Sequence, residues 1–169
     1  ESLKLWYEQG KLWYEDVLRS QSVEEKNRYA HWAKLAFERV YTHNPNDLLA
    51  LAAMLRLELL MKQPIPPQLE RLLIARLGST PLHESRMGNI FALVNCALLK
   101  TCALTLQQVE RYLLTALENP HGLRSNNRAA ILNALGSVYW VEHRFAESAH
   151  YFSQAYHAKQ DETLARQAI

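Results

Sequence analysis

The amino-acid sequence predicts an all-α fold built from stacked antiparallel helix hairpins. Apolar residues recur with helical periodicity along almost all of the 169 residues. No segment alternates apolar and polar residues with the period of two that a half-buried strand requires. The chain has 5 Gly and 6 Pro, too few for an all-β fold with many tight turns. Short links between the helical segments favour seven to nine helices stacked as antiparallel hairpins.

Composition excludes several functional classes. The chain is 49% hydrophobic and 21% charged, which is ordinary for a folded globular protein. Its formal net charge of +2 is too balanced to indicate binding to nucleic acid or to an anionic membrane surface. No apolar run approaches the ~18 residues of a membrane-spanning helix.

The first three helices are expected at residues 2–18, 23–42 and 48–61. The turn Asn44-Pro45-Asn46-Asp47 ends the second helix and supplies a cap for the third. The third helix, LLALAAMLRLELL, is apolar nearly all round. Such a helix is expected to be buried on several sides.

Prolines in residues 63–67 interrupt the helical pattern. A short helix is expected at residues 67–77, with a proline in its first turn and Gly78 as its stop. Another is expected at residues 84–100. Thr105 and Gln108 have the spacing of a capping box, which opens a helix that ends near residue 118.

The last segments predict helices at residues 126–142 and 145–159, and Asp161 has the position of a cap for a ninth. We expect one helical repeat domain, 1–169, cut from a longer protein. It comprises degenerate helix pairs in 1–81, better repeats in 83–160 and the start of a further helix in 161–169.

One helix pair carries a distinct pattern of small and aromatic residues. Gly136 and Ser148 are small enough to let two helix backbones approach closely, and Tyr139 is large enough to fill the space beside them. The full set is Leu132, Leu135, Gly136 and Tyr139 in the first helix, and Ser148, Phe152 and Ala155 in the second. This spacing resembles the tetratricopeptide repeat, a helix–turn–helix unit of 34 residues.

Weaker copies of the pattern lie upstream. The second-helix half recurs as Ala33, Phe37, Val40 and Pro45. Trp6, Gly10 and Trp13 resemble a first-helix half, but the helix that follows them does not keep the repeat's frame. An irregular helical bundle is the alternative, because it also places small and aromatic residues at this spacing.

The resemblance implies a right-handed α-solenoid in which the first helix of each pair lines a concave groove for an extended peptide or a partner helix. On this mapping the groove residues are Phe91, Asn95 and Leu98 in one helix, and Asn133, Ser137, Trp140 and Val141 in another. We therefore expect a non-catalytic protein–protein interaction module. The basic carboxylate clamp of some family members is not evident.

Motifs that would indicate catalysis, a cofactor or a metal are not found. The sequence has no nucleophile elbow, no H-E-x-x-H motif, no Walker motif and no dinucleotide fingerprint. His150 and His157 are two helical turns apart, about 10.5 Å along the axis, which is too far for one metal ion. We expect no catalytic residues, no cofactor and no metal.

Cys96 and Cys102 are the chain's two cysteines. A chain that folds back after the helix would bring them within bonding distance. In an oxidising compartment they would form a disulfide that staples the helix end, whereas in the cytosol both would remain thiols.

A second resemblance concerns the opening LWYEQGKLWYEDV, the cysteine spacing and the helices that end in Asn-Pro. These features resemble the periplasmic repeat tails of bacterial envelope proteins whose membrane part is a polysaccharide polymerase or glycosyltransferase. The resemblance favours the periplasmic side of a membrane over the cytoplasm. It leaves two alternatives open. An accessory domain that contacts a glycan or acceptor would expose aromatic residues in a cleft, and an oligomerisation domain would expose an apolar patch near Leu164 and Ile169.

Overall fold

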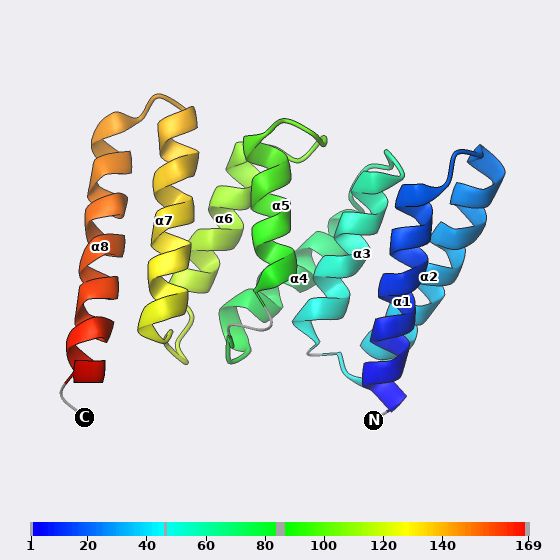
Figure 1. Ribbon diagram of the computed structural model, residues 1–169, viewed down its shortest axis with the longest axis horizontal. Helices are drawn as coiled ribbons and strands as arrows, with labels where there is room; N and C mark the ends of the chain where they lie inside the picture. The colour runs from blue at the N-terminus through cyan, green and yellow to red at the C-terminus, as the bar shows by residue number, and fades with distance from the viewer. Residues whose placement is uncertain (1, 46, 84–86, 168–169) are drawn as a thin grey trace. The chain divides into compact units, whose positions relative to one another are not determined.

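The computed structural model describes residues 2–45, 47–83 and 87–167, and these form eight α-helices without strands (Figure 1). The helices are α1 Ser2–Arg19, α2 Val23–His43, α3 Leu48–Leu60, α4 Pro67–Ser79, α5 Gly88–Leu98, α6 Leu106–Leu117, α7 Ser125–Val141 and α8 Phe145–Gln167. The predicted all-α class and the predicted range of seven to nine helices are confirmed. None of these helices is long and apolar enough to cross a membrane.

The chain divides into two compact units, Glu1–Leu73 and Ile74–Ile169, with the division inside α4. In the first unit, α1 and α2 form an antiparallel hairpin, and α2 also packs against α3 (Figure 1). Their shared core includes Ala33 and Phe37 of α2 together with Ala53 and Leu57 of α3. α3 buries residues on several sides, as its composition predicts.

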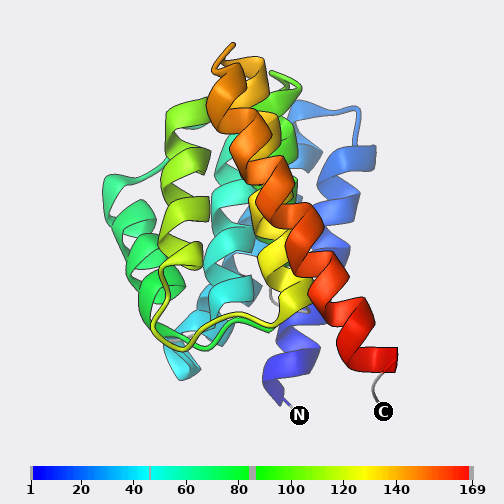
Figure 2. The same ribbon diagram turned by 90° about the vertical axis from the view of Figure 1, so that its left-hand side faces the viewer.

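In the second unit, α5, α6 and α7 pack together, and α7 forms an antiparallel hairpin with α8 (Figures 1 and 2). Ile90, Leu113 and Leu135 are fully buried in this unit. The buried Asn119 amide secures the loops, because its Nδ2 atom donates to the carbonyl oxygens of Leu77 at 2.7 Å and Thr80 at 2.8 Å.

The α7–α8 hairpin shows why its second helix carries a small residue. The Ser148 hydroxyl of α8 is buried and donates to the Gly136 carbonyl oxygen of α7 at 2.7 Å. A Cβ atom on Gly136 would lie 2.7 Å from the ring of Phe152. The two helices therefore meet as closely as the residue pattern predicts.

Two of the predicted caps are confirmed. The Asp47 side chain accepts from the Ala50 amide at 3.0 Å and caps α3. Thr105 and Gln108 form a reciprocal capping box at the start of α6. Both caps satisfy amides that have no partner within their helix.

Several predicted boundaries are wrong. α8 continues to Gln167, so Asp161 is an interior residue and no ninth helix begins there. No Gly or Pro interrupts this stretch, and Arg166 pairs with Glu162 one turn away at 2.7 Å, which supports continuation. Gly78 lies inside the last turn of α4. α5 begins at Gly88 rather than at residue 84, and residues 84–86 lie outside the described part of the chain.

Candidate functional site

A surface hollow of about 230 Å³ lies between α5 and α7 in the second unit. We call it the α5–α7 groove. Its walls come from two helices that each follow a short link and each open a helix pair. It is lined by Phe91, Val94, Asn95 and Leu98 of α5, and by Ala130, Asn133, Ala134 and Ser137 of α7.

Helical periodicity explains how these residues come to share one groove. On each helix the lining positions follow the pattern i, i+3, i+4, i+7, which places them on one face. The adjoining stripes of α5 and α7, which include Ile90 and Leu135, are fully buried in the core. Burial of these stripes holds both groove-lining faces in place.

The groove combines apolar walls with neutral polar groups. Asn95 and Asn133 are exposed, and each side-chain amide offers both donors and an acceptor. The Ser137 hydroxyl donates to the Asn133 carbonyl oxygen one turn back at 3.1 Å, so its oxygen lone pairs remain available to accept from a ligand. None of the lining residues is charged.

The structure brings together five of the seven residues that the sequence analysis assigns to the groove. Trp140 and Val141 are not among the lining residues. Leu98 is the last residue of α5, whereas α7 continues to Val141, so the end of α7 extends past its neighbour. Trp140 is 59% exposed and packs edge-on against Phe145 at the α7–α8 turn, with ring centroids 4.8 Å apart.

The residues that define the repeat pattern are placed mostly as expected. Leu132, Leu135, Gly136, Tyr139, Ser148 and Ala155 are buried. Phe152 contacts Gly136 yet remains 36% exposed. The Phe152 ring is therefore covered on its α7 side and partly open to water.

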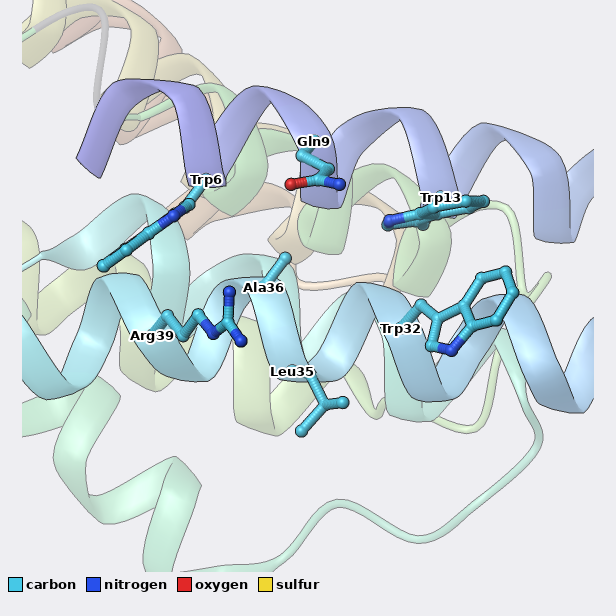
Figure 3. Close-up of a pocket in the computed structure, with 7 residues that line it drawn as sticks. All are labelled: Trp6, Gln9, Trp13, Trp32, Leu35, Ala36 and Arg39. Carbon is cyan, nitrogen blue, oxygen red and sulfur yellow. The ribbon is translucent and has the colours of Figure 1, made fainter. Parts of the chain in front are cut away.

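A second hollow, of about 320 Å³, lies between α1 and α2 in the first unit. Figure 3 shows Trp6 and Trp13 projecting from α1 on either side of Gln9, with α2 residues opposite. We call it the aromatic pocket. Its lining residues are Trp6, Gln9 and Trp13 of α1, and Trp32, Leu35, Ala36 and Arg39 of α2. The sequence analysis assigned none of them to a binding site; the spacing of Trp6 and Trp13, which places them on one helix face, is the signal that could have found it.

Tyr139 links three helices beside the α7–α8 turn. Its hydroxyl donates to the Glu110 carboxylate of α6 at 2.8 Å, and the Arg144 guanidinium lies 4.4 Å from its ring centroid. Burial, and next the hydrogen bond to Glu110, raise the pKa of Tyr139 well above its ordinary value of 10. The Arg144 Nε atom donates to Glu147 at 2.9 Å, which ties the turn to the start of α8.

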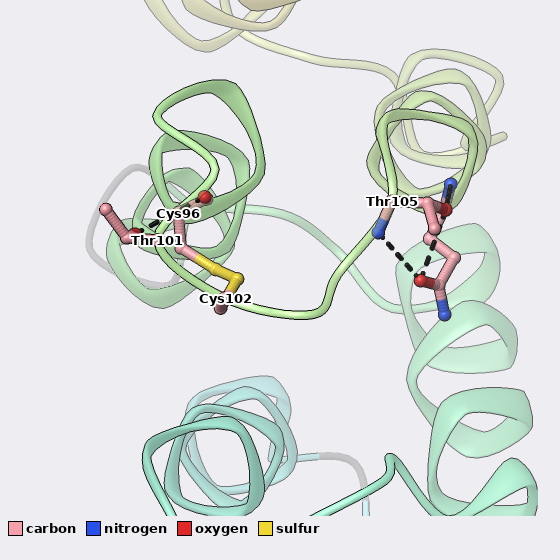
Figure 4. Close-up of a disulfide and its surroundings, with 5 residues drawn as sticks. Cys96, Thr101, Cys102 and Thr105 are labelled. Atoms are coloured by element: carbon pink, nitrogen blue, oxygen red, sulfur yellow. Dashed lines mark hydrogen bonds between the residues drawn. A yellow bond between two sulfur atoms is a disulfide. The ribbon is translucent and has the colours of Figure 1, made fainter. Parts of the chain in front are cut away.

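Cys96 and Cys102 form a disulfide that joins the last turn of α5 to the following loop (Figure 4). Their Cα atoms are 5.7 Å apart. The Thr101 amide donates to the Cys96 carbonyl oxygen at 3.0 Å, and Lys100 takes a left-handed conformation with φ of 55°. The disulfide therefore closes the turn directly beside Asn95 and Leu98 of the groove.

Within residues 2–45, 47–83 and 87–167, no group of three or more His, Cys, Asp or Glu side chains is placed to hold a metal ion. Leu164, named for the oligomerisation alternative, is 59% exposed. Ile169 lies outside the described residues.

Comparison of the chain with protein-family models, with curated proteins and with solved structures finds no match in any of the three.

Proposed function

We propose that this chain is a non-catalytic interaction module, similar to a tetratricopeptide repeat, that binds an extended peptide in the α5–α7 groove. The observation that carries the proposal is that two helices, each the first of its pair, jointly line one surface hollow. The buried core positions of α5 and α7 hold this surface in place, so binding does not have to pay for ordering it.

The groove chemistry suits the backbone of an uncharged peptide segment. Asn95 and Asn133 are placed on facing helices, where their amides can pair with both the N–H and the C=O groups of an extended chain. Phe91 and Leu98 supply apolar contact area for side chains. With no charge in the lining, the groove favours neutral segments over acidic or basic tails.

A random peptide library selected on the immobilised protein tests this proposal. Peptides that enrich are expected to bind an Asn95→Ala/Asn133→Ala double variant at least about tenfold more weakly, because two amide pairings are lost. The matched control is Asn126→Ala, an exposed asparagine of α7 that does not line the groove. Equal weakening by the control and the groove variants would contradict the proposal, and so would a selection that enriches no peptide.

We further propose that the protein works in an oxidising compartment, such as the periplasm that the envelope-protein resemblance implies. The Cys96–Cys102 pairing supports this, because structural disulfides persist mainly outside reducing compartments. Protein purified from its native source without reductant is expected to show no free thiol after unfolding, and a mass about two daltons below that of the reduced form. Two titratable thiols would contradict the assignment.

A further inference from the structure

The aromatic pocket is a second hollow, separate from the groove that the peptide-binding proposal uses. Trp6 and Trp13 are seven residues apart on α1, which separates them by about 10.5 Å along one helix face. Figure 3 shows Trp6 at one end of the pocket and Trp13 with Trp32 at the other. Trp13 and Trp32 meet at a centroid distance of 4.7 Å with their planes tilted by 60°.

The indole rings line the walls of the pocket and leave part of their surface accessible to a ligand. Trp32 is 39% exposed and Leu35 is 43% exposed. Trp6 and Trp13 are partly buried at the pocket walls, and Trp13 stacks on Tyr29 at 5.8 Å. The face of an aromatic ring carries partial negative charge, so it attracts the C–H groups on one face of a saturated sugar ring as well as the edges of other aromatic rings.

Polar groups stand between these rings. The Gln9 side chain makes no hydrogen bond with any described residue, and its amide offers donors and an acceptor to the pocket. Vicinal hydroxyls of a sugar can satisfy both functions at once. A proline-rich peptide, the other common ligand of aromatic grooves, lacks the N–H groups that the Gln9 acceptor needs.

The charge of the pocket is positive. The Arg39 guanidinium lies 5.7 Å from the Trp6 ring centroid and forms no ion pair with a described residue. Arg28 lies 5.9 Å from the Trp32 ring centroid and likewise has no carboxylate partner in the described part of the chain. Cations already occupy the neighbourhood of these rings, so the pocket disfavours a cationic ligand and favours a carboxylate.

We propose that the aromatic pocket binds an acidic oligosaccharide, with pyranose rings stacked on the tryptophans, a uronic acid carboxylate paired with Arg39, and hydroxyls bonded to Gln9. The volume of about 320 Å³ is at the lower end of the range for small-ligand sites, which fits a few sugar rings rather than a long chain. The ligand's carboxylate would replace water around an exposed cation, so its contribution is to selectivity more than to affinity.

The test uses the whole chain on an array of neutral and uronate-containing oligosaccharides, followed by tryptophan-fluorescence titration of the saccharides that bind. Trp32→Ala is expected to weaken binding about tenfold through loss of a stacking face. Arg39→Gln is expected to abolish the preference for acidic over neutral saccharides. Trp140→Ala and Arg71→Gln are the matched controls, because both residues are exposed and lie outside the pocket.

The proposal is overturned if no saccharide binds, if binding persists unchanged in Trp32→Ala, or if Arg39→Gln leaves the acidic preference intact. Capture of an acidic proline-rich peptide in place of saccharides, lost in Trp32→Ala, would also overturn it. The Asn95→Ala/Asn133→Ala variant should bind saccharide normally, which separates this site from the α5–α7 groove.

Discussion

Two hairpins of the molecule, α1–α2 and α7–α8, share a glycine–phenylalanine contact but differ in the number of residues that separate the two partners. In each, a glycine of the first helix lies against a phenylalanine of the second. A Cβ atom on Gly10 would lie 2.5 Å from the Phe37 ring, and one on Gly136 would lie 2.7 Å from the Phe152 ring. The partners are 16 positions apart in α7–α8 but 27 positions apart in α1–α2.

The difference of 11 residues corresponds to about three helical turns. α1 continues nine residues beyond Gly10, whereas α7 continues five beyond Gly136. Fourteen residues of α2 precede Phe37, whereas seven residues of α8 precede Phe152. Because the extra length in each helix is close to whole turns, the inward faces are preserved although the spacing between glycine and phenylalanine differs.

The second difference between the hairpins is what covers the phenylalanine. Phe37 is 1% exposed, and it shares a core cluster with Ala53 and Leu57 of α3. Phe152 is 36% exposed on α8, whose main contact is with α7. The same residue pair should therefore contribute differently to stability in the two hairpins.

The largest effect on stability is expected from truncating the two phenylalanine side chains to alanine. Phe37→Ala should lower the free energy of unfolding by about 3–5 kcal/mol, because it removes a fully buried ring and leaves a cavity. Phe152→Ala should cost only about 1–2 kcal/mol, because its ring is already partly in water. Urea titration followed by circular dichroism measures both, and equal costs would break the comparison.

An intermediate effect is expected from filling the two glycines. Gly10→Ala should cost about 1–3 kcal/mol, because the enclosed Phe37 ring has no room to yield. Gly136→Ala should change stability by less than about 1 kcal/mol, because the exposed Phe152 ring can move away and alanine favours the helix. Thermal denaturation of the two variants side by side checks this. A more damaging change at Gly136 would contradict the argument from exposure.

A third effect, smaller than those at Phe37 and Gly10, concerns a hydrogen bond that the α7–α8 hairpin makes to a third helix. Tyr139→Phe removes the donor to Glu110 and should cost about 1–2 kcal/mol at neutral pH. The pKa of Tyr139 is raised in the folded protein, so its stabilising contribution is complete below the ordinary value of 10 and is lost as pH rises beyond it. The wild-type protein should therefore lose stability above pH 10 by up to about 1.4 kcal/mol per pH unit relative to Tyr139→Phe. Parallel alkaline profiles would contradict the raised pKa.

The sequence could predict the helices because their signals are local. Periodicity, the Asp47 cap and the Thr105–Gln108 capping box each depend on residues within one turn. The end of α8 could not be predicted, because Asp161 is a residue type that often begins a helix. In the structure it lies inside α8, next to the Glu162–Arg166 ion pair.

The groove was accessible to sequence reasoning only in part. Asn95 and Asn133 can be predicted from helical spacing once α5 and α7 are each taken as the first helix of a pair. Val141 was wrongly assigned to the groove, because the groove ends where α5 ends, at Leu98. The spacing of Trp6 and Trp13 indicates one wall of the aromatic pocket. Its other wall could not be derived, because the contact of Trp13 with Trp32 depends on how α1 and α2 pair in their hairpin.

The most direct test of the central claim, that the α5–α7 groove binds peptide, is to locate a library-selected peptide on the protein by amide chemical-shift mapping. The largest shifts are expected at Asn95, Leu98, Asn133 and Ser137, and they should vanish in Asn95→Ala/Asn133→Ala but persist in Asn126→Ala. Shifts confined to α1, α2 or α8, with the groove residues unmoved, would contradict it.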